Sequence, residues 1–200
     1  MLKIRSWMLV ALIAYSVLMR LVPYILFQFG LSIDPETTIY PWNFSPLPAI
    51  CLFGGAMYAQ RKYAFLIPLA AWIVADLGVW ALTGKAEWAF YPAIGFVYGS
   101  VALTVVAGLV IRKRKRVETV AVAGLSSALL FYVVTNFGTW ATGGGMYYPM
   151  TLEGLTQCYV AGIPFFRNSL ISMAVFSGVL FSPIVLHLAA TDEQPAPVPA

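Results

Sequence analysis

Charged residues are scarce in this sequence. Only 10% of its 200 residues are Asp, Glu, Lys or Arg, whereas 60% are hydrophobic and the mean hydropathy is +0.82. A soluble globular domain has about 25% charged residues, and a disordered chain has few large apolar ones. The composition therefore excludes both classes. It predicts a protein that crosses a membrane several times, since each crossing helix needs about 20 mostly apolar residues.

Histidine and cysteine are also rare, which limits the chemistry. His187 is the single histidine, and Cys51 and Cys158 are the two cysteines. One histidine does not make a His-based metal centre, and two cysteines in apolar surroundings do not make a disulfide framework. No Gly-rich loop precedes a Lys to hold phosphates. We therefore expect no metal, no cofactor and no enzymatic activity. If the protein were an enzyme, Asp76 and Glu153 would be the candidate catalytic carboxylates.

Apolar runs divide the sequence into six candidate spans. They cover residues 7–29, 44–60, 63–83, 89–111, 118–140 and 164–189. Each run is long enough to be read as a membrane helix rather than as a strand. We therefore expect an all-α polytopic membrane protein. Residues 1–190 would form a single six-span transmembrane domain, and residues 191–200 a disordered, Pro-rich cytoplasmic tail.

Basic residues are concentrated on one side of this six-span arrangement. Nine of them precede the first span or lie in the connections 61–62 and 112–116, namely Lys3, Arg5, Arg61, Lys62, Arg112, Lys113, Arg114, Lys115 and Arg116. The opposite loops contain a single Lys85. The positive-inside rule therefore predicts that both termini are cytoplasmic. We interpret the basic run as a topology determinant that contacts anionic membrane lipid, not nucleic acid.

Two segments depart from a simple span. Residues 44–60 contain Pro46 and Pro48, which should start a helix late, and two glycines that would let another helix approach closely. The stretch 151–189 would be about 58 Å long as one helix, nearly twice the bilayer core. We expect Pro164 to break it, leaving an external amphipathic piece over 152–162 before the last span.

Three ionisable side chains fall inside spans, where burying an unpaired charge is costly. They are Arg20, Asp76 and Arg167. Arg20 and Asp76 each lie 14 residues above the cytoplasmic start of their span, or about 21 Å at 1.5 Å per residue. The two side chains can therefore pair if the first and third spans are neighbours. Either residue could instead contact a substrate.

Further polar residues fall at the outer depth of the spans, which suggests a pocket open to the outside. The candidate solute-binding residues are Asn43, Asp76, Asn136, Trp140, Tyr148, Glu153, Gln157, Arg167 and Asn168. Simpler explanations stay open for several of them. Asn43 could be a helix N-cap, Arg167 could extend to the outer headgroups, and the aromatic residues could form an interfacial belt.

Two blocks of sequence carry a resemblance to a known family. The first contains Asn43-Phe44-Ser45-Pro46, Leu52-Phe53-Gly54-Gly55-Ala56, Ala64-Phe65-Leu66-Ile67-Pro68-Leu69 and Asp76-Leu77. The second contains Thr135-Asn136-Phe137-Gly138-Thr139-Trp140, Tyr148-Pro149, Thr151-Leu152-Glu153-Gly154-Leu155, Cys158-Tyr159 and Pro164-Phe165-Phe166-Arg167-Asn168. Together they resemble an uncharacterised family of bacterial integral membrane proteins regarded as candidate transport proteins. That family is in turn similar to the substrate-binding S component of energy-coupling factor transporters.

The resemblance implies a multi-pass protein of the bacterial inner membrane that binds a vitamin-like small-molecule solute from outside and assists its uptake. Its partner would be a transmembrane coupling subunit driven by cytoplasmic ATPases. A different class of function is a structural or assembly subunit of another membrane complex, with no small-molecule substrate. Stoichiometric co-purification with such a complex, without a retained solute, would distinguish the second class from the first.

Overall fold

The computed structural model describes residues 6–31, 44–58 and 60–191, and within these ranges the fold is entirely helical. The helices are α1 (Ser6–Gln28), α2 (Leu47–Met57), α3 (Arg61–Thr83), α4 (Ala86–Ala89), α5 (Ile94–Ile111), α6 (Val117–Thr142), α7 (Leu152–Leu180) and α8 (Pro183–Thr191). The all-α expectation is confirmed. Residues 192–200 of the expected disordered tail lie outside the described residues.

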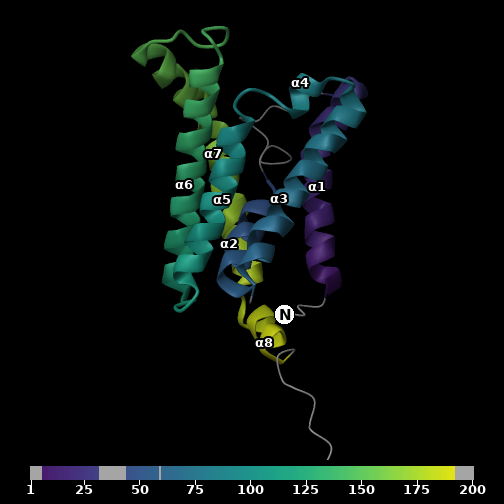
Figure 1. Cartoon of the computed structure of the whole chain (residues 1–200), viewed down its shortest axis with the longest axis vertical. Coiled ribbons are helices and arrows are strands. Elements are labelled where there is room, and N and C mark those ends of the chain that lie inside the picture. The colour runs from purple at the N-terminus through teal and green to yellow at the C-terminus, as the bar shows by residue number, and fades with distance from the viewer. Residues whose placement is uncertain (1–5, 32–43, 59, 192–200) are drawn as a thin grey trace, which may run out of the picture.

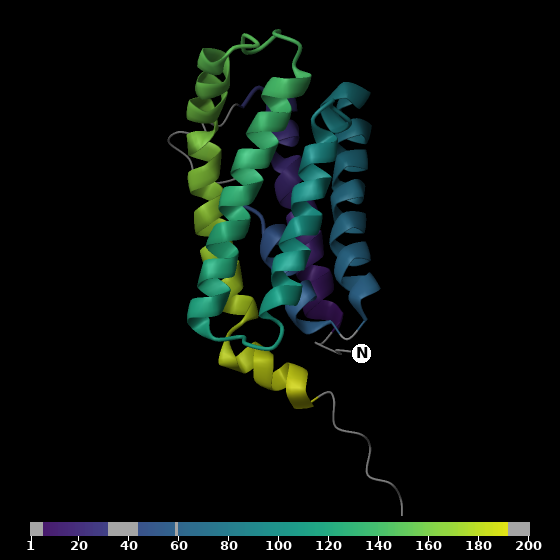
Figure 2. The ribbon, with the colours of Figure 1, turned by 60° about the vertical axis from the view of Figure 1, so that its left-hand side comes forward.

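Five long helices form a bundle and run roughly along one axis (Figures 1 and 2). The stretches Val10–Gln28, Arg61–Thr83, Ala86–Ile111, Val117–Thr142 and Leu152–Leu180 are each long and apolar enough to cross a membrane. The chain is therefore a multi-pass membrane protein. Five of the six expected spans overlap these stretches, although the last one was expected at 164–189 and lies at Leu152–Leu180. The expected span 44–60 has no counterpart among them.

The two ends of the bundle differ in composition. At one end α1 begins, α8 lies beneath the bundle, and the connection 112–116 joins α5 to α6 (Figures 1 and 2). Helix α3 also begins at this end, with Arg61 and Lys62. We call it the basic end. The opposite end, which we call the α4 end, contains α4 and the connection between α6 and α7.

The expected span 44–60 is instead the short helix α2, which lies inside the bundle. Pro46 occupies the N-cap position, and the backbone becomes extended again at Tyr58. Eleven residues rise only about 16 Å at 1.5 Å per residue, about half of a 30 Å bilayer core. Nine of the eleven residues are buried. The prediction of a span here was wrong. The apolar side chains of this run pack against the other helices inside the bundle and do not face lipid.

Glycines allow α2 to pack directly on α5. A Cβ atom added at Gly55 would lie 2.9 Å from the Cα atom of Gly108, and one added at Gly108 would lie 2.9 Å from the Cα atom of Gly55. These separations are shorter than ordinary van der Waals contact, so only glycine fits on either side of the crossing. Around it, Ile50, Leu52 and Phe53 are fully buried and pack with residues of α5, α6 and α7.

Helix α7 is continuous through Pro164, so the break expected there is wrong. Both sides of Pro164 are held against α6. Before the proline, the Tyr132 hydroxyl donates to the Tyr159 carbonyl at 2.6 Å, and the Cys158 thiol donates to the Asn136 carbonyl at 3.3 Å. After it, Phe166 stacks on the Tyr132 ring, with the centroids 4.6 Å apart. The segment 152–162 is therefore part of the bundle and not a separate external piece. The chain turns only at Phe181, before α8 begins with Pro183.

Candidate functional site

A cavity of about 450 Å³ lies among the long helices, beyond the start of α2. Leu47 and Pro48, the first residues of α2, line it together with residues of α1, α3, α5, α6 and α7. The cavity exists because α2 is short. This helix fills the centre of the bundle only toward the basic end. Its volume is in the range of about 300–1,000 Å³ that small-molecule sites usually have.

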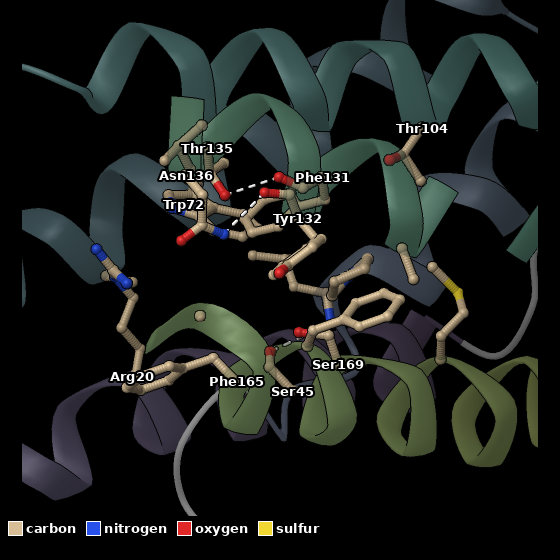
Figure 3. A pocket seen from close by; sticks show the side chains of 18 of the residues that line it. Arg20, Ser45, Trp72, Thr104, Phe131, Tyr132, Thr135, Asn136, Phe165 and Ser169 are labelled. Atoms are coloured by element: carbon tan, nitrogen blue, oxygen red, sulfur yellow. Dashed lines mark hydrogen bonds between the residues drawn. The ribbon is translucent and has the colours of Figure 1, made fainter. Parts of the chain in front are cut away.

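Aromatic side chains form much of the cavity wall (Figure 3). The rings of Trp72 on α3 and Phe131 on α6 lie 6.2 Å apart between centroids. On another side, Tyr132 stacks on Phe166 of α7 with the centroids 4.6 Å apart. Further aromatic lining comes from Tyr24, Tyr91 and Phe165. The wall therefore offers flat apolar faces supplied by five helices or their flanking turns.

Arg20 reaches the cavity from α1, and its charge is matched by Asp76 of α3. The guanidinium Nε donates to Asp76 Oδ1 at 2.8 Å, and Nη2 donates to the same oxygen. The Tyr98 hydroxyl on α5 donates to Asp76 Oδ2 at 2.8 Å. Asp76 is fully buried, whereas a quarter of the Arg20 side chain stays exposed. Arg20 also lies over the Trp72 ring, 5.9 Å from its centroid.

Several polar side chains in the wall donate hydrogen bonds to carbonyls of their own helix. Thr104 donates to the Ser100 carbonyl at 3.0 Å, Thr135 to the Phe131 carbonyl at 2.7 Å, and Asn136 Nδ2 to the Tyr132 carbonyl at 2.8 Å. Such bonds satisfy a polar group inside an apolar helix. These side chains are therefore stably placed without a ligand.

Two donors in the wall differ from the others. Trp72 Nε1 and Ser127 Oγ are buried, and neither has a hydrogen-bond partner among the described residues. Both residues line the cavity, from α3 and from α6. A buried donor without an acceptor costs about 1–3 kcal/mol, so these two groups are the points of the wall at which a bound molecule would gain most.

The structure brings only part of the predicted pocket together. Asn136 lines the cavity, and Asp76 lies behind Arg20 at its edge. The other described candidates do not line it, namely Trp140, Tyr148, Glu153, Gln157, Arg167 and Asn168. Asn43 lies outside the described residues.

Each of these other residues has a different environment. Trp140 Nε1 donates to the Pro149 carbonyl at 2.9 Å and so ties α6 to the following connection. Glu153 and Gln157 are exposed on α7, 3.4 Å apart between Oε1 and Nε2. Arg167 is exposed and Asn168 is buried, so these adjacent positions lie on different faces of α7.

The sequence interpretation missed the aromatic and hydroxyl residues that form most of the wall. They are common in any membrane helix, so their residue type alone gives little indication of a site. Their spacing on α6 is more informative. Ser127, Phe131, Thr135 and Thr139 recur every four residues and all line the cavity, as expected for one helix face.

The fold and the cavity together define a helical membrane protein with an internal, aromatic-lined chamber. Among the described residues, no group of three or more His, Cys, Asp or Glu side chains could hold a metal ion. The sequence model of a family of unknown function, DUF6580, matches residues 1–195, and the chain belongs to this family. No curated protein and no solved structure matches the chain.

Proposed function

We propose that this protein is a membrane-embedded binding protein for a small solute and that it assists uptake of that solute. The observation that supports the proposal most is the cavity of about 450 Å³ inside the bundle. Protein interiors are normally close-packed, with few voids larger than a water molecule. A chamber of this size, maintained by a short central helix, is therefore better explained by a bound molecule than by stability.

The charge distribution supports a direction for binding. The cavity occupies the half of the bundle away from Arg61, Lys62 and the connection 112–116. If the positive-inside rule holds here, the basic end and both termini face the cytoplasm, and the solute enters from outside. We further propose that the membrane is a bacterial inner membrane. As in the S components that the sequence resembles, energy would come from a coupling subunit with cytoplasmic ATPases.

The function can be tested by filling the cavity. Ser169→Trp places a large ring in it from α7, whereas Val175→Trp adds the same ring on the same helix at a residue that is 46% exposed and off the cavity. Cells that naturally produce the protein are compared with the two variants for depletion of solutes from a complex medium, measured by mass spectrometry. We expect one solute to be depleted more slowly with Ser169→Trp only.

Membrane levels of both variants are measured, and Ala128→Phe serves as a second cavity-filling variant if Ser169→Trp is not inserted. Equal depletion of every solute by all strains would contradict the proposal. Stoichiometric co-purification with another membrane complex, together with that result, would favour a structural or assembly subunit instead.

A further inference from the structure

The two buried donors without partners restrict what the cavity can bind. Trp72 is 8% exposed and Ser127 is 4% exposed, and neither Nε1 nor Oγ has an acceptor among the described residues. An indole N–H only donates hydrogen bonds. The molecule that satisfies Trp72 must therefore present an acceptor at this point of the wall, and Ser127 can donate to another.

The N-terminus of α2 also favours a solute with hydrogen-bond acceptors. The first turn of α2 faces the cavity through Leu47 and Pro48, and a helix N-terminus carries a partial positive charge. Arg20 adds a guanidinium at the edge. The charge of this guanidinium is already matched by Asp76, which is buried behind it. The remaining partial positive charge at the N-terminus of α2 favours a hydrogen-bond acceptor in the solute.

The shape of the wall adds a third restriction. The rings of Trp72, Phe131, Tyr132 and Phe166 come from three different helices and line the cavity. Figure 3 labels the first three. Aromatic faces gain most from another flat π system, by offset stacking or edge-to-face contact. Aliphatic chains would fill the same volume without using the directionality of these rings.

We propose that the cavity binds a planar conjugated solute that bears hydrogen-bond acceptors, such as a carbonyl or ring nitrogen. Trp72 Nε1 and Ser127 Oγ donate to its acceptors, and its plane lies against the aromatic wall. This inference rests on the proposed function, since it names the chemical class of solute for the same cavity.

The experiment identifies the small molecules that accompany the intact protein. The wild-type chain is purified in mild detergent from cells that naturally produce it, extracted with methanol, and the extract is analysed by mass spectrometry against protein concentration. Four single variants are treated identically. Trp72→Phe and Ser127→Ala each remove one unpartnered donor. Trp80→Phe, on the same helix as Trp72, and Ser100→Ala change the same residue types away from the cavity.

We expect wild-type protein, Trp80→Phe and Ser100→Ala to retain one planar, acceptor-bearing compound at a near-stoichiometric level. Loss of one hydrogen bond weakens binding about two- to tenfold, so Trp72→Phe and Ser127→Ala should each retain correspondingly less after equal washing. Both substitutions change the side-chain volume only slightly, so we expect both variants to fold. Thermal melting of each variant checks that they do.

The other outcomes separate the inference from the proposed function. A retained aliphatic solute, such as a lipid, would overturn the inference and leave solute binding intact. The same holds for a planar solute that both donor variants retain fully. If wild-type protein retains no compound beyond what Ser169→Trp retains, the inference and the proposed function both fail.

Discussion

Asp76 joins three helices through its two oxygens. One accepts from Arg20 of α1, and the other accepts from Tyr98 of α5 at 2.8 Å, while Asp76 itself lies on α3. A carboxylate buried in this way is tolerated only because its lone pairs are occupied by a cation and a hydroxyl. Contacts between α1 and the rest of the bundle are mainly with α3, so the pair is a principal link between α1 and its neighbours.

Asp76→Asn should lower the free energy of unfolding by about 3 kcal/mol, because it removes the negative charge that compensates Arg20. Arg20→Met alone should also destabilise the protein, since it leaves a buried carboxylate. The double variant should lose less than the sum of the two single losses. The measurement is unfolding of the purified protein by SDS titration in mixed micelles.

Glu153→Gln is the control for loss of a carboxylate. Its contact with Gln157 is long and exposed, so its effect should stay within about 0.5 kcal/mol. Strictly additive losses for Arg20 and Asp76 would contradict the energetic coupling that the geometry indicates.

At the scale of elements, sequence arguments succeed where one physical quantity dominates. Apolar length identifies the five long helices, and the rise per residue places Arg20 and Asp76 at one depth, where the structure pairs them. The same arguments fail where tertiary packing decides. The apolar content of 44–60 does not distinguish lipid from a protein interior. Pro164 does not break α7, and contacts with α6 hold the helix on both sides of it.

The crossing of α2 and α5 gives a prediction at this scale. Gly108→Ala should lower stability by about 1–3 kcal/mol, the usual cost of overpacking a well-packed contact, because the added Cβ meets the backbone of α2. Gly99→Ala changes the same residue type on the same helix, where nothing lies within 4 Å of the new Cβ. It should be neutral or gain up to about 1 kcal/mol from helix propensity. Thermal melting in detergent checks both, and equal melting temperatures would rule out a tight crossing.

For the whole molecule, the distribution of basic residues and the position of the cavity are both asymmetric along the axis of the bundle. The short helix α2 fills the bundle toward the basic end, and the cavity occupies the remaining half. Composition alone indicates a membrane protein, but it does not predict an internal cavity or its position. The cavity depends on the length of one internal helix, which the sequence interpretation overestimated. The orientation in the membrane decides which compartment the cavity serves.

Labelling with a membrane-impermeant maleimide tests this orientation, because Cys51 and Cys158 are buried and give the wild-type chain a low background. Lys113→Cys introduces a thiol at the basic end, and Met146→Cys introduces one at an 80% exposed position at the α4 end. If the basic end is cytoplasmic, Met146→Cys is labelled in intact cells and Lys113→Cys only after permeabilisation. The reverse pattern would place the cavity on the cytoplasmic half, and uptake from outside would then no longer follow from the charge distribution.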